Sequence, residues 1–154
     1  LLPDGSKRRF LASSVLVGST QVLSQPITGQ STLAGSVVVD LNQNDVFDSG
    51  ETGLPGVLVT LAGRDSSGNT VVIRQTTDST GQFIFRVLPA GIYHLIEAQP
   101  IGFQDGADLP GTPPPASIID DAFAAISLGS SENGEGFDFL ERFASGSMIP
   151  LASS

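Results

Sequence analysis

Short apolar segments separated by turn residues constrain the fold of this chain more than any other feature. The segments are rich in valine, isoleucine, leucine and phenylalanine, and they recur at the roughly 8–12-residue spacing typical of a β-sandwich. Glycine (18) and proline (10) are plentiful, and no helical heptad or long amphipathic stretch competes with this pattern. We therefore predict an all-β sandwich of about seven strands. The predicted strands cover residues 36–40, 57–61, 70–76, 82–87, 92–97, 124–128 and 137–140.

The sandwich is expected to occupy residues 33–142, with a linker on each side. Residues 1–32 lack sustained periodicity and are rich in polar residues, which predicts a linker or N-terminal extension. Residues 143–154 are polar and predict a C-terminal linker. Residues 104–117 contain four prolines and are expected to form a long irregular loop. Because the first residue is not methionine, we expect the chain to be a piece of a longer protein or a processed product.

The charge and composition of the chain exclude several classes of function. The net charge is -9, from 16 acidic and 7 basic residues, so neither nucleic acid nor an anionic membrane surface is an expected partner. The basic run at residues 7–9 precedes an apolar run that is too short, and too interrupted by serine, to span a membrane. Without cysteine there is neither Cys-ligated zinc nor a cysteine nucleophile. An acidic chain is, however, a suitable host for divalent cations.

The segment Asp40–Glu51 has the spacing of a calcium-binding loop. Oxygen-bearing side chains stand at loop positions 1, 3, 5, 9 and 12, and position 7 can supply a backbone carbonyl. With the last glutamate binding through both oxygens, the loop offers about seven oxygen ligands to a hard cation. The alternative is a solvated acidic turn, because aspartate, asparagine and glycine also favour turns; the complete spacing favours calcium. The predicted ligands are Asp40, Asn42, Asn44, Val46, Asp48 and Glu51.

Other polar residues give weaker signals. Asp78, Asp105 and Asp108 lie in predicted turns or loops, where a second metal site competes with ordinary turn hydrogen bonds and a solvated loop. His94 is the only histidine, and without a partner it predicts an exposed strand residue rather than part of a catalytic triad. Glu97 is expected to face inward and to make a structural hydrogen bond. We therefore identify no catalytic residue and predict that the chain is not an enzyme.

The order of the loop and turn motifs resembles that of a known family, the SdrD B-like domains of bacterial surface proteins, which are relatives of the collagen-adhesin B domains. The resemblance covers about residues 34–142. It implies an Ig-like or transthyretin-like sandwich, often repeated in tandem, that serves as a calcium-stiffened stalk of an extracellular protein. The motifs that carry the resemblance are residues 40–51, Gly53-Leu54-Pro55-Gly56-Val57, residues 77–83, Leu88-Pro89-Ala90-Gly91-Ile92-Tyr93 and residues 97–103.

The sequence departs from the family pattern in two places. Loop position 6, usually glycine, is Asp45, which adopts the left-handed conformation less easily; an Asp45→Gly change is therefore expected to tighten calcium binding. Collagen-adhesin relatives can form an isopeptide bond between a strand lysine and a late asparagine, helped by an acid. Glu97 matches the acid, but the only lysine, Lys7, lies in the predicted linker. We therefore predict no such bond, which leaves calcium as the expected brace.

The sequence thus predicts a non-catalytic, calcium-binding spacer of an extracellular or cell-surface bacterial protein, in contact with neighbouring domains of the same chain. One alternative is an adhesion module that binds an extracellular protein or glycan through strand edges or residues 104–117. Another is an accessory domain of a secreted enzyme. None of the three implies nucleic-acid binding or direct membrane insertion.

Overall fold

The structure is a computed structural model that describes residues 30–144, so the linkers predicted at both ends lie almost wholly outside the described residues. Within this range every regular element is a strand, and no helix has the length and hydropathy needed to cross a bilayer. The strands are β1 (Ser31–Val39), β2 (Leu58–Asp65), β3 (Thr70–Thr76), β4 (Gln82–Leu88), β5 (Gly91–Glu97), β6 (Phe103–Leu109), β7 (Pro115–Ile119), β8 (Ala122–Leu128) and β9 (Asn133–Phe143).

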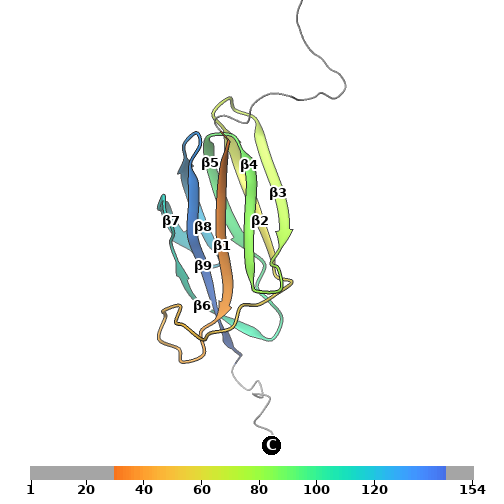
Figure 1. Ribbon diagram of the computed structural model, residues 1–154, viewed down its shortest axis with the longest axis vertical. Coiled ribbons are helices and arrows are strands. Elements are labelled where there is room, and N and C mark those ends of the chain that lie inside the picture. The colour runs from red at the N-terminus through yellow and green to blue at the C-terminus, as the bar shows by residue number, and fades with distance from the viewer. Residues whose placement is uncertain (1–29, 145–154) are drawn as a thin grey trace, which may run out of the picture.

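The strands form two sheets, which confirms the predicted all-β sandwich. One sheet has the order β4-β1-β9-β6 and the other the order β3-β2-β5-β8-β7. All the neighbouring strands are antiparallel except β1 and β9, which run parallel to each other. The chain therefore enters the domain at the start of β1 and leaves it at the end of β9, at opposite poles of the sandwich (Figure 1).

A row of phenylalanines joins the two sheets in the core. Phe139 on β9 is fully buried, and its ring centroid lies 4.8 Å from that of Phe123 on β8 in the facing sheet. Phe83 on β4 lies 6.3 Å from Phe139, and Phe137 lies 5.4 Å from Phe123. Aromatic pairs at these separations contribute beyond the burial of their area. The apolar alternation predicted from the sequence thus forms a single core between the sheets.

The prediction of an irregular loop over residues 104–117 was wrong, and this accounts for the two strands beyond the expected seven. Most of that segment forms β6 and the start of β7, with prolines between them and at the first position of β7. The apolar alternation that reveals a strand is missing in β6, where Asp105 and Asp108 stand at half-buried positions. In addition, β6 pairs with β9 through a register shift between these two aspartates. The domain also begins two residues earlier than predicted, at Ser31.

Truncation of Phe139 is expected to destabilise the domain strongly, because this ring contacts both sheets. We expect Phe139→Ala to lower the free energy of unfolding by about 3–5 kcal/mol, as for other buried phenylalanines. Urea unfolding followed by circular dichroism measures this loss. Ile101→Ala is the control, because Ile101 is 98% exposed and its truncation should change stability by less than about 0.5 kcal/mol. Equal losses in the two variants would contradict the packing described here.

Candidate functional site

The predicted calcium loop leaves β1 at Asp40 and lies at the pole where β9 ends (Figure 1). Asp40 itself is buried, and its backbone N–H donates to the carbonyl of Glu141 on β9 at 2.8 Å. Its carboxylate accepts from the backbone N–H groups of Asn44 (3.2 Å) and Asp45 (2.9 Å). The first predicted ligand is therefore fixed by the sheet on one side and orders the loop on the other.

The other predicted ligands of the loop form one hydrogen-bonded ring. The amide groups of Asn42 and Asn44 both donate to Oδ2 of Asp48, at 3.0 and 2.8 Å. The carboxylate of Glu51 accepts from the backbone N–H groups of Leu41 and Asp48, both at 3.1 Å, and so closes the ring. Val46 is exposed at the outer edge of the loop.

The carboxylates of the three acidic ligands of the loop do not form a close group. Within residues 30–144, two groups of three acids come within 4.8 Å of one another, and neither contains Asp40, Asp48 or Glu51. The loop therefore brings its two asparagines onto Asp48 through amide hydrogen bonds rather than packing its carboxylates together.

Asp45 has the backbone conformation that its loop position requires. Its φ is 62°, in the left-handed region that glycine adopts most easily. Its carboxylate forms an ion pair with Nη2 of Arg142 on β9, which also lies 3.9 Å from Oδ2 of Asp40. The side chain at this position thus ties the loop to the strand that leaves the domain.

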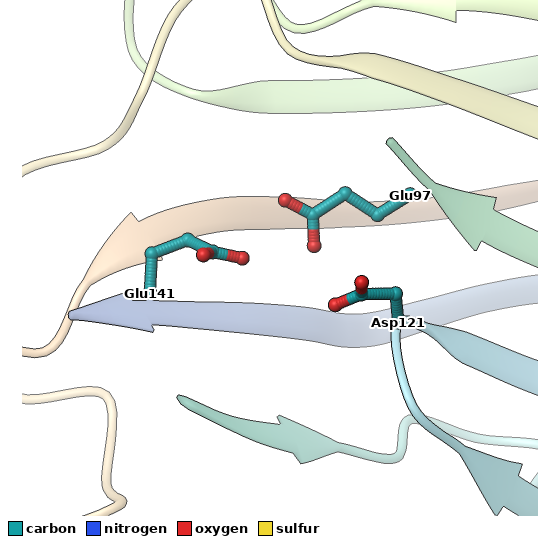
Figure 2. A group of neighbouring side chains, drawn as sticks. All are labelled: Glu97, Asp121 and Glu141. Carbon is teal, nitrogen blue, oxygen red and sulfur yellow. The ribbon is translucent and has the colours of Figure 1, made fainter. Parts of the chain in front are cut away.

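A second group of acids lies inside the sandwich, close to the same pole. Glu97 at the end of β5, Asp121 in the turn between β7 and β8, and Glu141 on β9 have carboxylate oxygens within 4.8 Å of one another (Figure 2). Asp105 and Asp108 on β6 form a second such triad with the same Asp121. We call these five residues the interior acidic cluster. The glutamates are the most deeply buried members, with 3% of Glu97 and 0% of Glu141 exposed.

The interior acidic cluster has few hydrogen-bond donors. Gln99 donates from Nε2 to Glu141, and the backbone N–H of Asp121 donates to Oδ2 of Asp108 at 3.1 Å. Every member nevertheless keeps at least one buried oxygen with no donor among the described residues, and for Glu97 this holds for both oxygens. Such burial is costly for a charged group.

Burial raises the pKa values of the whole cluster. Desolvation, reinforced by repulsion from Glu141, raises the pKa of Glu97 to about 10. Desolvation also raises the pKa of Asp105 to about 8 and that of Asp108 to about 7, with neighbouring aspartates adding to both shifts. The pKa values of Asp121 and Glu141 are raised for the same first reason. Without a cation, Glu97 and Asp105 therefore hold their protons near neutral pH in the folded domain.

The structure separates the three aspartates that were candidates for a second site. Asp105 and Asp108 come together in the interior acidic cluster. Asp78 instead caps a turn, where its Oδ1 accepts from the backbone N–H groups of Thr80 (2.9 Å) and Gln82 (3.0 Å). This confirms the turn interpretation of Asp78, and it replaces the solvated loop expected for the other two residues with a half-buried strand.

Two further predictions were wrong. Glu97 faces inward as expected, but instead of a structural hydrogen bond its carboxylate meets other acids. His94 is half-buried rather than exposed, and its Nδ1 accepts from the backbone N–H of Ala125, at an irregularity in the pairing of β5 with β8. Lys7, the basis of the isopeptide prediction, lies outside the described residues.

Sequence reasoning missed two members of the interior acidic cluster. The inward direction of Glu141 could have been predicted from the sequence, because Phe137, Phe139 and Glu141 occupy every second position of one strand and therefore face the same side. The position of Asp121 could not have been predicted, because only the arrangement of the two sheets brings its turn against β9.

Comparison with known proteins identifies one family. The family model of the SdrD B-like domain matches residues 31–127. The comparison with curated proteins finds no similar sequence.

The solved structures that match this chain share little sequence with it. The minor pilin GBS52 of Streptococcus agalactiae is 17% identical, with 80% of this chain and 48% of that chain covered and a TM-score of 0.49. A double mutant of the shaft pilin SpaA from Lactobacillus rhamnosus GG is 14% identical, with 75% and 52% covered and a TM-score of 0.49. The major plantain pollen allergen Pla l 1 is 13% identical, with 76% and 98% covered and a TM-score of 0.43. This chain thus spans about half the length of the two pilins, and the family assignment depends on the match over residues 31–127 alone.

The stability of the cation-free domain is expected to fall as pH rises. The raised pKa values mean that the folded state holds protons that the unfolded state has already lost, so this stabilisation is complete below about pH 4 and is lost progressively toward the folded pKa values of about 7 to 10. In chelator, we expect the melting temperature to drop by roughly 5–10 °C between about pH 5.5 and pH 8.5. A Glu97→Gln/Asp108→Asn variant should show a flatter profile. A melting temperature that rises over this range in the unsubstituted protein would contradict the burial of these acids.

Proposed function

Because the chain belongs to the SdrD B-like domain family, whose members are structural modules of surface proteins, we propose that it is a calcium-braced spacer of an extracellular bacterial protein. The observation that carries this proposal is the parallel pairing of β1 with β9, which places the entry and exit of the domain at opposite poles (Figure 1). Copies joined end to end would each add the length of the sandwich, roughly 35 Å for a strand of 11 residues.

The same pairing suits a domain that carries tension. A force applied at the start of β1 and the end of β9 loads the two strands in shear, because they lie side by side and run the same way. Their hydrogen bonds then resist the force together rather than opening one after another. The pairs run from Thr32 with Asn133 to Val39 with Glu141, so nearly the whole of β1 takes part.

Calcium in the loop would brace the end of this pair. We place the ion in the loop Asp40–Glu51, where the amide N–H groups of two asparagines already converge on Asp48. A cation would take the place of these N–H donors and bind the asparagines through their amide oxygens. Both ends of the loop are fixed to β1, since Val39 donates its backbone N–H to the carbonyl of Thr52 at 2.8 Å. A cation that closes the loop therefore stabilises the last pairs of β1 with β9. The proposed ligands are the side chains of Asp40, Asn42, Asn44, Asp48 and Glu51 and the carbonyl of Val46.

Melting and single-molecule pulling, each with calcium and with chelator, test this proposal. Ligand that binds the folded state alone adds about 2.7 kcal/mol when its free concentration is 100 times the dissociation constant. We therefore expect calcium to raise both the melting temperature and the force needed to unfold the domain. An Asp48→Asn/Glu51→Gln variant should weaken the calcium affinity of the loop by at least about tenfold, because two of its three charged ligands become neutral.

Asp65→Asn is the matched control, because Asp65 also organises an exposed turn but lies outside the loop. It should respond to calcium as the unsubstituted protein does. If calcium binding at the loop, measured by calorimetry, were unchanged in the Asp48→Asn/Glu51→Gln variant, the proposed ligand set would be wrong. If unfolding forces were low and independent of calcium, the spacer proposal would lose its mechanical basis.

Asp45, one of the left-handed residues of the loop, offers a finer test. Replacement of Asp45 by glycine removes both the backbone strain at this position and the ion pair with Arg142, so Asp45→Asn is the control that removes the charge but keeps a side chain. We expect Asp45→Gly to bind calcium about fivefold more tightly than Asp45→Asn, since the left-handed conformation costs other residues about 1 kcal/mol more than glycine. Calorimetric titration of the two variants measures this ratio. Equal affinities would show that backbone strain at this position does not limit binding.

A further inference from the structure

The interior acidic cluster links the two sheets at a place where the apolar core ends. Glu97 and Asp121 belong to the five-stranded sheet and its turn, whereas Glu141, Asp105 and Asp108 belong to the four-stranded sheet. Figure 2 shows the carboxyl groups of Glu97, Asp121 and Glu141 directed toward a common space between their strands. Like charges held this close repel one another, so the cluster calls for a positive partner.

We propose that the interior acidic cluster is a second calcium site, separate from the loop, with Asp121 as its central ligand. The ion would join the two sheets and replace apolar packing at this end of the core. This inference goes beyond the proposed spacer function and does not require the loop to bind calcium.

The burial of Glu97 is an observation independent of the number of acids. Only 3% of Glu97 is exposed, and both of its carboxylate oxygens point into the cluster and lack a donor among the described residues. A carboxylate that only solvates a surface turn has no reason to be enclosed in this way. An enclosed, unpartnered carboxylate directed at two others is the arrangement that a bound cation would satisfy.

The distances fit an ion of the size of calcium. Two oxygens that each lie about 2.4 Å from one Ca²⁺ can be no more than about 4.8 Å apart. Both triads of the cluster meet this limit, and Asp121 takes part in both. All the candidate ligand atoms are carboxylate oxygens, which suits calcium or magnesium and disfavours zinc. Magnesium forms shorter bonds and would require the oxygens to lie closer together.

The basic residue next to Glu141 in the sequence is already paired with the loop. Arg142, the residue that follows Glu141, has Nη2 directed at Asp45 and Asp40 of the loop. Gln99 supplies the cluster with a neutral amide, which does not balance charge. Protons on the carboxyl groups are therefore the competing explanation, and the experiment must distinguish a bound ion from bound protons.

Three variants distinguish the two sites. The loop variant is Asp48→Asn/Glu51→Gln, and the interior variant is Glu97→Gln/Asp121→Asn. Asp138→Asn is the matched control, because Asp138 is a half-buried acid of β9 that lies outside both triads. For each protein we would measure bound calcium per chain by equilibrium dialysis at about 1 mM free calcium, with magnesium in a parallel series, and melting temperature in calcium and in chelator.

We expect the loop variant to lose the calcium of the loop and to keep the calcium of the interior acidic cluster. The interior variant should lose the calcium of the cluster and keep that of the loop. Asp138→Asn should bind as many ions as the unsubstituted protein. In chelator, the interior variant should melt at or above the temperature of the unsubstituted protein, because two carboxyl groups whose charged form burial disfavours have become neutral amides of the same shape. That result shows that its loss of calcium is not a loss of folding.

The outcomes for the two proposals are separable. If the loop variant binds no calcium, the interior site does not exist, whatever the interior variant does, and the loop proposal stands. If the loop variant binds as many ions as the unsubstituted protein and the interior variant binds none, the loop proposal is overturned and the interior site stands. If calcium changes the melting temperature of none of the proteins, protons alone neutralise the cluster and both proposals fall.

Discussion

The parallel pairing of β1 with β9 is the interaction on which the rest of this domain depends. It places two strands far apart in the sequence side by side at the centre of one sheet, and it directs entry and exit to opposite poles. It also sets the register that puts Val39 opposite Glu141. From this register follow the row of inward side chains on β9, the position of the loop after β1, and the direction in which tension would cross the domain.

The inward row of β9 changes from apolar to acidic along its length. Phe137 and Phe139 pack against the facing sheet, whereas Glu141, at the next inward position, meets Glu97 and Asp121. The aromatic part stabilises the sandwich by removing apolar surface from water. The acidic part opposes that stabilisation unless protons or a cation neutralise it. One end of β9 is thus held by aromatic packing, and the other end carries acids that must be neutralised.

The sequence predicted the features that depend on one continuous segment and missed those that depend on several strands. The β2 to β5 strands followed from apolar alternation, and the loop after β1 was readable because all its proposed ligands lie within the single segment Asp40–Glu51. The β6 strand was hidden because Asp105 and Asp108 occupy positions where a strand usually carries apolar residues. The interior acidic cluster draws on β5, β6, β9 and a turn, and no spacing within a single segment can reveal such a group.

Glu141 contacts both the loop after β1 and the interior acidic cluster. Its backbone carbonyl accepts the N–H of Asp40, the first residue of the loop, while its side chain lies in the interior acidic cluster. A cation that orders either group restrains the same residue of β9. Linkage then requires the effect to be reciprocal, so that an ion in the loop changes the affinity of the interior by the same factor as the reverse. The sign of that coupling depends on two opposed effects. Shared ordering of β9 favours the binding of both ions, whereas repulsion between the two cations opposes it. Salt screens this repulsion, so the repulsion is weaker at higher ionic strength.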